Sequence, residues 1–222
     1  MPPDTDTARA EICRVGRSLF ERGYVHATAG NISVRLPAGR GYLITPTDAC
    51  LGFLEPARLA HVAEDGTQLA GDRASKTLAL HRRIYAAEPE AQCVIHTHST
   101  HLVALTLAGV WRPEDILPPI TPYFVMKVGH VPLVPYHRPG AAEAADAVAA
   151  HIARARAAGT PIRAVMLDRL GPNVWHDTPA AAMATLEELE ETARLWLMTR
   201  PQPAPLDEPA IDELRRQFGA RW

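Results

Sequence analysis

Two histidines at alternate positions, His96 and His98, are the residues whose type and spacing point most directly to chemistry. They follow residues 93–95, a short apolar run that predicts a buried strand. Residues two apart in a strand point to the same side, so both imidazoles can face one divalent metal ion. Two hydrogen-bonded histidines at a strand end would give the same pattern, so the spacing by itself indicates half of a metal site.

The segments around this pair alternate between helical and extended patterns. Apolar periodicity predicts helices over residues 74–87, 100–109, 141–158 and 178–200, and an earlier helix that Gly23 ends. Strands are predicted around Ile32 and Val34, in residues 39–48 and 131–136, and on both sides of Gly171-Pro172. Asp65-Gly66 predicts a hairpin turn. Ser99-Thr100 forms a polar turn after the histidines, where open α/β sheets place ligands.

Composition limits the class of protein. With 222 residues, 47% hydrophobic and 22% charged, one large domain is expected. The formal net charge of −2, with no Lys/Arg cluster, argues against a nucleic-acid partner. No apolar stretch approaches the ~20 residues of a membrane span, and the first residues lack the charge of a signal peptide. Three cysteines at unrelated spacings fit a reducing compartment, so we expect a soluble, cytoplasmic protein with no membrane partner.

The last residues differ in composition from the rest. We expect residues 1–200 to form the domain, whereas residues 201–222 read as a proline-rich linker followed by a short amphipathic helix. A helix of this kind suits the surface of a neighbouring subunit, so intersubunit packing is its predicted role.

Six motifs in order resemble the class II aldolase/adducin family: ATAGNISVR, LITPTD, GDRASKTLALH, CVIHTHST, TPYFVMKVGHVPLVPYHRPG and LEELEETARLWL. The resemblance covers residues 27–197, and the fifth motif favours the branch that decarboxylates 3-oxo-tetronate 4-phosphates. It implies an α/β fold, a single three-layer α/β/α domain around a mostly antiparallel central sheet. It also implies a homotetramer with sites between subunits, and a small sugar-acid substrate.

By the same resemblance, His96 and His98 are the first two ligands of a divalent metal, Zn²⁺ in the first instance, with Mn²⁺ or Co²⁺ as alternatives. The residues matched to the binding of a substrate phosphate or carboxylate are Gly30, Asn31, Thr47, Ser75 and Lys76. Backbone N–H groups at a helix start suit an anion, and Lys76 adds a full charge. Asn31 as a plain turn residue and Lys76 at a solvated helix end are the structural alternatives.

Three positions depart from the family pattern. Thr77 replaces the acid/base glutamate, and its hydroxyl cannot act as a carboxylate base. Leu170 replaces the third histidine ligand and offers no lone pair to a metal. Asp48 puts a carboxylate where a small residue would let a phosphate approach, which makes a phosphorylated substrate less secure.

Other residues can stand in for those that are lost. His101 and His137 are the preferred further metal ligands, ahead of His130 and Asp168. Lys76 or Tyr123 is the candidate proton donor, because loss of carbon dioxide removes no hydroxyl proton.

The sequence therefore predicts a metal-dependent lyase that decarboxylates a small 3-oxo sugar acid, with or without a phosphate, through a metal-stabilised enediolate. Two alternatives stay open. In the first, the chain is a catalytically altered family member that serves as a binding or scaffold subunit. In the second, it is an aldolase or decarboxylase for an unphosphorylated keto acid.

Overall fold

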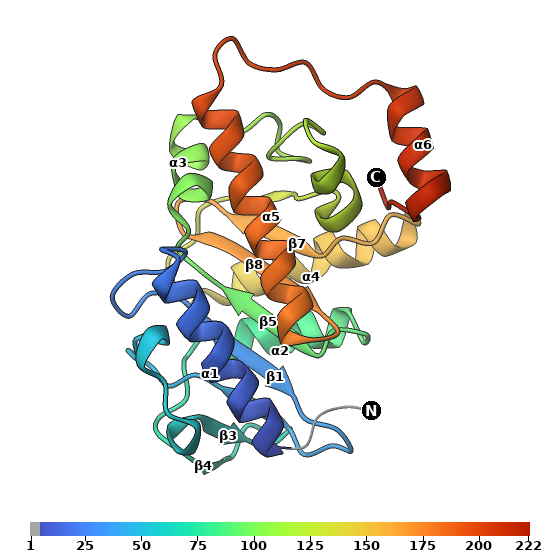
Figure 1. The fold of residues 1–222 in the computed structure, drawn as a ribbon. Coiled ribbons are helices and arrows are strands. Elements are labelled where there is room, and N and C mark those ends of the chain that lie inside the picture. Colours follow the sequence, from blue (N-terminus) through green and yellow to red (C-terminus); the bar gives the residue numbers. More distant parts are fainter. Residues whose placement is uncertain (1–4) are drawn as a thin grey trace. The chain divides into compact units, whose positions relative to one another are not determined.

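The computed structural model describes residues 5–222. The chain divides into two compact units that the polypeptide enters more than once (Figure 1). Unit 1 comprises the residues up to His98 together with Trp175–Met183, and unit 2 comprises Ser99–Val174 and Ala184–Trp222.

Unit 1 is an antiparallel sheet with helices. Its strands run in the order β4-β3-β2-β1-β5, and each neighbouring pair is antiparallel. Its elements are α1 (Thr5–Glu21), β1 (Asn31–Arg35), β2 (Tyr42–Ile44), η1 (Leu51–Phe53), η2 (Pro56–Arg58), β3 (Ala60–Val62), β4 (Gln68–Ala70), α2 (Leu78–Ala87) and β5 (Cys93–His96).

The two faces of strand β1 serve different purposes. Ile32 and Val34 are buried apolar residues that alternate along the strand with polar ones, as the sequence pattern predicts. On the opposite face the Ser33 hydroxyl contacts His81 at 2.7 Å and Tyr85 at 2.8 Å, and both belong to α2. Figure 1 shows α1 in front of β1 and α2 behind the strands. Unit 1 therefore has an apolar side and a side that carries buried polar groups.

Unit 2 also mixes helices and strands. Its elements are α3 (Thr100–Ala108), the π-helix η3 (Phe124–Val128), β6 (Leu133–Val134), α4 (Ala142–Ala157), β7 (Ala164–Leu167), β8 (Gly171–His176), α5 (Pro179–Met198) and α6 (Glu208–Phe218); β8 and α5 extend into unit 1. Strand β6 pairs parallel with β7, and β7 pairs antiparallel with β8. The predicted α/β class with a mostly antiparallel sheet is confirmed.

Several local predictions are confirmed. The Asp65-Gly66 turn joins β3 to β4, which pair antiparallel. Gly109, at φ 104°, follows the last residue of α3. The Thr178 hydroxyl accepts a hydrogen bond from the N–H of Ala181 at 3.1 Å and so caps the start of α5.

Two element boundaries were predicted wrongly. Helix α2 begins at Leu78 and not at position 74, because the residues before it form a turn closed by the N–H of Leu78 on the Ser75 carbonyl. The turn between β7 and β8 lies at residues 168–170, closed by the N–H of Leu170 on the Leu167 carbonyl. Gly171 and Pro172 therefore belong to β8 and not to the turn.

The C-terminal segment contacts unit 2 of its own chain. The Trp222 ring stacks on His130 with centroids 4.4 Å apart, and Arg215 Nε donates to the Trp222 carbonyl at 2.8 Å. Ile211 of α6 is buried. Packing of this segment on a neighbouring subunit stays a prediction.

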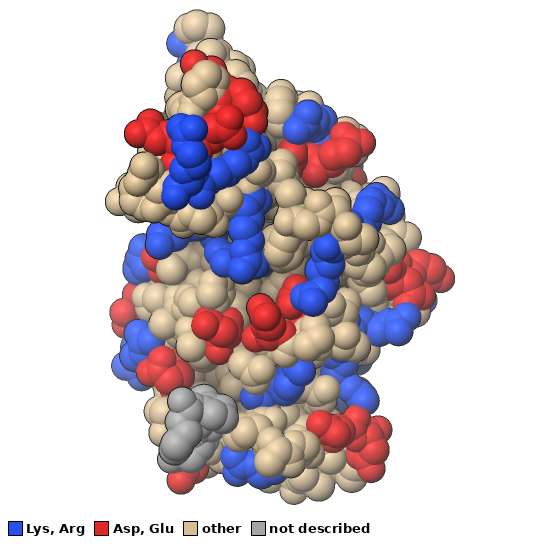
Figure 2. Space-filling view, turned by 90° about the vertical axis from the view of Figure 1, so that its right-hand side faces the viewer, with Lys and Arg blue, Asp and Glu red and all other residues tan. Residues whose placement is uncertain are grey.

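On the face drawn in Figure 2, acidic and basic side chains are interspersed, in keeping with a net charge of −2. Within residues 5–222, every helix is too short or too polar to cross a bilayer.

Candidate functional site

The end of β5 lies against the start of β1. Asn31 is the cross-strand partner of His96, so their side chains leave the same face of the sheet. Gly30, at φ +87°, passes so close that a Cβ atom would lie 2.8 Å from the His96 carbonyl oxygen. Only glycine fits this turn, which brings Asn31 to the first predicted metal ligand.

The rings of His96 and His98 lie at a distance compatible with two ligands of one ion, although β5 ends at His96 and His98 lies in the segment after the strand, not in it as the sequence predicted. Their ring centroids are 5.1 Å apart, with the planes at 70°. Two imidazoles bound to one tetrahedral ion through Zn–N bonds of about 2.0 Å would have centroids roughly 5 Å apart. Burial, and then the charge of His26, lowers the pKa of His98, which keeps its lone pair available. These two residues fit a divalent metal as half of its ligand set.

Two loops beside this edge are tied to each other and to β1. The Thr45 N–H donates to the Ile32 carbonyl at 3.0 Å, and the Ile32 N–H donates to Thr45 Oγ1 at 3.2 Å. The Thr47 N–H donates to the Arg73 carbonyl at 2.9 Å, and the Ser75 N–H donates to the Thr45 carbonyl at 3.3 Å. Thr47 and Ser75 are thus held on neighbouring loops of unit 1.

Lys76 and Thr77 form the turn that enters α2. Lys76 is exposed, and the Thr77 N–H donates to Ser75 Oγ at 3.3 Å. The N–H groups of Thr77, Leu78 and Leu80 at the start of α2 already donate to Ser75 and Thr77. The exposed ammonium group of Lys76 is therefore the feature of this turn that suits an anionic group of a substrate.

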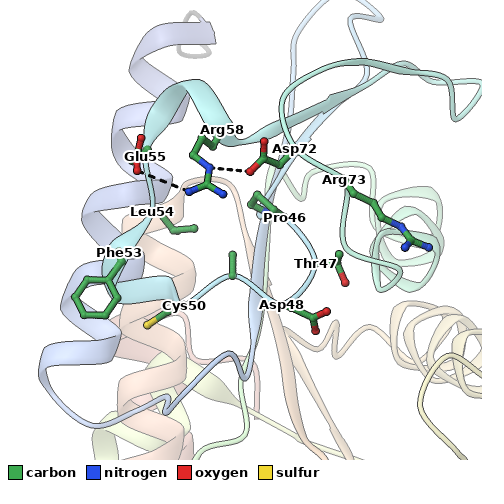
Figure 3. A pocket seen from close by; sticks show the side chains of 11 residues that line it. Pro46, Thr47, Asp48, Cys50, Phe53, Leu54, Glu55, Arg58, Asp72 and Arg73 are labelled. Carbon is green, nitrogen blue, oxygen red and sulfur yellow. Dashed lines mark hydrogen bonds and ion pairs between the residues drawn. The ribbon is translucent and has the colours of Figure 1, made fainter.

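Figure 3 shows a pocket of about 360 Å³ beside the Thr47 loop. Arg58 Nε donates to Asp72 at 2.7 Å, so its charge is already paired. Asp48 is exposed and adopts φ +57°, the left-handed region that favours glycine. Arg73, which belongs to the GDRASKTLALH motif but was not predicted as a site residue, extends away from the Arg58–Asp72 pair in Figure 3.

Within unit 2, His101 has a carboxylate partner that the sequence did not reveal. Its Nδ1 lies 2.8 Å from Glu190 Oε1, and the N–H groups of His101 and Leu102 donate to the same carboxylate at 2.8 and 3.0 Å. Glu190 is buried on α5. A carboxylate on one ring nitrogen is the usual support of a metal-binding histidine, so His101 keeps Nε2 for another role.

The remaining candidates of unit 2 lie in loops. Tyr123 is 59% exposed and directly precedes the π-helix, a local irregularity common at functional sites. His137 is half-buried in the segment after β6, and the Asp168 N–H donates to the Val134 carbonyl at 3.0 Å. Since β6 and β7 are parallel, His137 and Asp168 both follow the carboxyl ends of neighbouring strands.

Two neighbours within unit 2 hold the His130 ring in place. Its Nδ1 lies 2.9 Å from Asp115 Oδ2, and its ring stacks on Trp222. Leu170, at the family's third-ligand position, lies half-buried in the β7–β8 turn. Across residues 5–222, His, Cys, Asp and Glu nowhere come together in a group of three or more that could hold a metal ion.

The predicted residues therefore divide by unit. Unit 1 brings together His96, Asn31 and Gly30, and ties the Thr47 and Ser75 loops beside them. Tyr123, His101 and His137 belong to unit 2, and their part in the site stays a prediction.

Comparison with known proteins identifies the type of enzyme to which this geometry belongs. A relative from Cupriavidus necator, named 3-oxo-tetronate 4-phosphate decarboxylase, is 57% identical over 219 residues, covering 96% of this chain and 97% of the relative. One of the same name from Escherichia coli K12 is 40% identical over 208 residues, covering 93% and 94%.

Solved structures agree. The crystal structure of YgbL from Klebsiella pneumoniae matches with a TM-score of 0.87 at 40% identity, covering 96% of this chain and 100% of that one. The L-fuculose-1-phosphate aldolase of Thermus thermophilus matches with a TM-score of 0.73 at 27% identity, covering 89% and 98%. Residues 10–197 match the family model described as the class II aldolase and adducin N-terminal domain. The chain therefore belongs to the class II aldolase and adducin family.

Proposed function

We propose that this chain decarboxylates a small 3-oxo sugar acid that carries a terminal phosphate. It is a carbon–carbon lyase of the class II aldolase family. The proposed substrate class rests on the 57% identity to a 3-oxo-tetronate 4-phosphate decarboxylase over 96% of the chain. The imidazole pair beside Asn31 supports the chemistry.

In this proposal the loops of unit 1 bind the anionic end of the substrate. The polar side chains of Asn31, Thr47 and Ser75 donate hydrogen bonds, and Lys76 at the start of α2 supplies charge. Gly30 leaves the space that lets the Asn31 turn approach the end of β5.

His96 and His98 would hold a divalent metal, Zn²⁺ first, with Mn²⁺ or Co²⁺ as alternatives, and His101 or His137 is the proposed further ligand. When bound, the metal would supply Lewis-acid polarisation of the substrate carbonyl. Glu190 would hold His101 in the tautomer that leaves Nε2 unprotonated.

The reaction breaks one carbon–carbon bond and moves one proton. The electron pair of that bond stays on the carbon beside the carbonyl as carbon dioxide leaves, and gives an enediolate. Lys76 Nζ or the Tyr123 hydroxyl then donates a proton to that carbon. No hydroxyl proton has to be removed first, so Thr77 in place of a glutamate is compatible with decarboxylation.

The test is release of carbon dioxide from 3-oxo-tetronate 4-phosphate by protein purified without added metal, with the metal content measured in parallel. We expect about one equivalent of metal, turnover that a chelator abolishes, and recovery on adding Zn²⁺, Mn²⁺ or Co²⁺. Replacing His96 or His98 with alanine should remove both metal and turnover. Full turnover in metal-free protein would refute metal dependence.

Thr77 and Leu170 favour one other candidate, a binding or scaffold subunit without catalysis. Two histidines alone hold metal weakly, so such a protein would be purified nearly empty and would release no carbon dioxide.

Asp48 favours a third candidate, an unphosphorylated keto acid as the substrate. Its carboxylate stands exposed at the pocket beside Thr47, where it would repel a phosphate. Activity that phosphate-bearing analogues fail to inhibit would identify this case.

We also propose that the protein is a cytoplasmic homotetramer, with residues 1–200 as the family domain and residues 201–222 between subunits. The interspersed charge on the face drawn in Figure 2, with a net charge of −2, supports a small-molecule substrate rather than a nucleic acid.

A further inference from the structure

A buried chain of polar groups lies under the candidate metal site in unit 1. The Ser33 hydroxyl is 2.7 Å from His81 Nδ1 and 2.8 Å from the Tyr85 hydroxyl, which is also 3.0 Å from the Ser33 carbonyl oxygen. Ser33 and His81 are fully buried, and Tyr85 is 2% exposed. Polar groups this deep are costly unless each is hydrogen-bonded, so their protons can be assigned by counting.

Only one placement of the hydrogen atoms gives each of these three contacts a donated proton. Tyr85 donates its hydroxyl proton to the Ser33 carbonyl, Ser33 donates its own to the Tyr85 oxygen, and His81 Nδ1–H donates to Ser33 Oγ. In the other tautomer Ser33 must donate to His81, and one of the two Tyr85 contacts is left without a proton. His81 therefore carries its proton on Nδ1 and a lone pair on Nε2.

That lone pair lies on the face of the sheet that bears the site. His81 Nε2 is buried and has no hydrogen-bond partner among the described residues, and the same is true of Asn31 Oδ1. Asn31 and Ser33 are two apart on β1, so they share a face, and His96 is the cross-strand partner of Asn31.

We propose that His81 is a positioning residue for His96, and that its Nε2 lone pair accepts the ring N–H of His96 when His96 binds metal. A histidine that binds metal through one nitrogen carries its proton on the other, and an acceptor for that proton fixes the ring and its tautomer. Ser33 and Tyr85 act one step further away, because they fix the tautomer of His81. The inference rests on the proposed metal site.

Two substitutions at one position separate this role from a structural one. In His81→Asn, the amide nitrogen replaces Nδ1 and keeps the bond to Ser33, but nothing replaces the Nε2 acceptor. In His81→Gln, the amide oxygen can reach the Nε2 position and keeps the acceptor. Competition with a chromophoric chelator would measure the affinity of the metal-free, full-length protein for Co²⁺ and Zn²⁺, and thermal unfolding would confirm that both variants fold.

We expect His81→Asn to bind metal about 10- to 100-fold more weakly than the wild type, and His81→Gln to lose clearly less. A merely structural role predicts the reverse order, because asparagine preserves the contact with Ser33. Equal losses in the two variants, or the reverse order, would overturn the proposal.

A second readout needs neither metal nor activity. Histidine ¹⁵N resonances of the metal-free protein report which ring nitrogen is protonated, and the His81 signals are those missing from His81→Gln. Protonated Nδ1 with bare Nε2 supports the proposal, and protonated Nε2 overturns it. If the wild type binds no metal, the proposed function fails, and so does the role of His81 toward a metal, whereas the tautomer result still decides whether the buried acceptor exists.

Discussion

The surroundings of each histidine in this protein determine its chemistry. His81 is fully buried and neutral, His98 is half-buried with a lowered pKa, and His101 rests on the carboxylate of Glu190. His130 is held by Asp115. The same side chain can therefore be an acceptor, a ligand or a packing group, and the neighbours decide which.

Lys76→Ala tests the proposed proton donor. If Lys76 donates the proton that replaces carbon dioxide, kcat should fall about 10²- to 10⁴-fold. If Lys76 only attracts the substrate anion, KM should rise while kcat stays near the wild-type value. Steady-state decarboxylation kinetics measure both quantities, and Tyr123→Phe provides the matched test of the alternative donor. Unchanged kinetics in Lys76→Ala would exclude both roles.

His81 predicts how stability depends on pH. Its pKa is about 3 in the folded protein and 6.5 for an unperturbed histidine, so the unfolded state binds the proton first as the pH falls. Above pH 6.5 the His81 ring is neutral in both the folded and the unfolded state, so it does not change the free energy of unfolding. Between pH 6.5 and about 3 the folded state loses about 1.4 kcal/mol per pH unit.

Urea unfolding at pH 7, 6 and 5 measures this loss. The free energy of unfolding of the wild type should fall about 2 kcal/mol more between pH 6.5 and 5 than that of His81→Gln, which lacks the titrating ring. Ser33, which contacts the ring, and His96, whose charge acts on it, are present in both proteins. Equal slopes in the two proteins would show that His81 is not buried in its neutral form.

At the scale of elements, strand β1 organises unit 1. Its alternation sends Ile32 and Val34 into the apolar core and Asn31 and Ser33 toward α2 and the end of β5. A shift of one residue in the pairing with β5 would exchange these faces, which makes the register essential to the site.

Gly30→Ala tests the close approach that sets this register. The new Cβ would lie 2.8 Å from the His96 carbonyl oxygen, in a backbone conformation that alanine rarely adopts. We expect a loss of about 2–5 kcal/mol in the free energy of unfolding, combining left-handed strain with overpacking. Weaker metal binding should accompany it.

Gly23→Ala is the matched control, since Gly23 has φ +76° but no atom lies within 4 Å of the position that a Cβ atom would occupy. It should cost only the strain, about 1–2 kcal/mol. Chemical denaturation of both variants gives the comparison, and equal losses would show that the contact with His96 is unimportant.

At the scale of the whole molecule, the C-terminal segment holds part of unit 2. Trp222 packs on His130 and edge-on against Phe124, the first residue of the π-helix that follows Tyr123. The segment can thus stabilise its own chain whether or not it also contacts a neighbour.

Deletion of residues 201–222 separates these roles. We expect the variant to be less stable and to lose the proposed homotetramer, which sedimentation equilibrium would detect. Trp222→Ala is the control: it should lower stability by about 1–3 kcal/mol and leave the assembly unchanged. A deletion variant that remains tetrameric would show that the segment acts only within its own chain.

The sequence by itself determined the elements that depend on local chemistry. Asp65-Gly66 specified a hairpin, Thr178 specified a helix start, and the alternation at Ile32 and Val34 specified a strand with one apolar face. The His96/His98 spacing predicted a metal pair from strand alternation, but β5 ends at His96, and the metal role of the pair stays a prediction.

Only the tertiary structure decided which distant residues meet. Ser33 lies 48 positions before His81, and His101 lies 89 positions before Glu190, yet each pair shares a hydrogen bond. No periodicity encodes such contacts, because they depend on strand register and on how α2 and α5 pack. The sequence therefore identified His96 and His98 as the candidate ligands, and the tertiary structure revealed the buried acceptor beneath them.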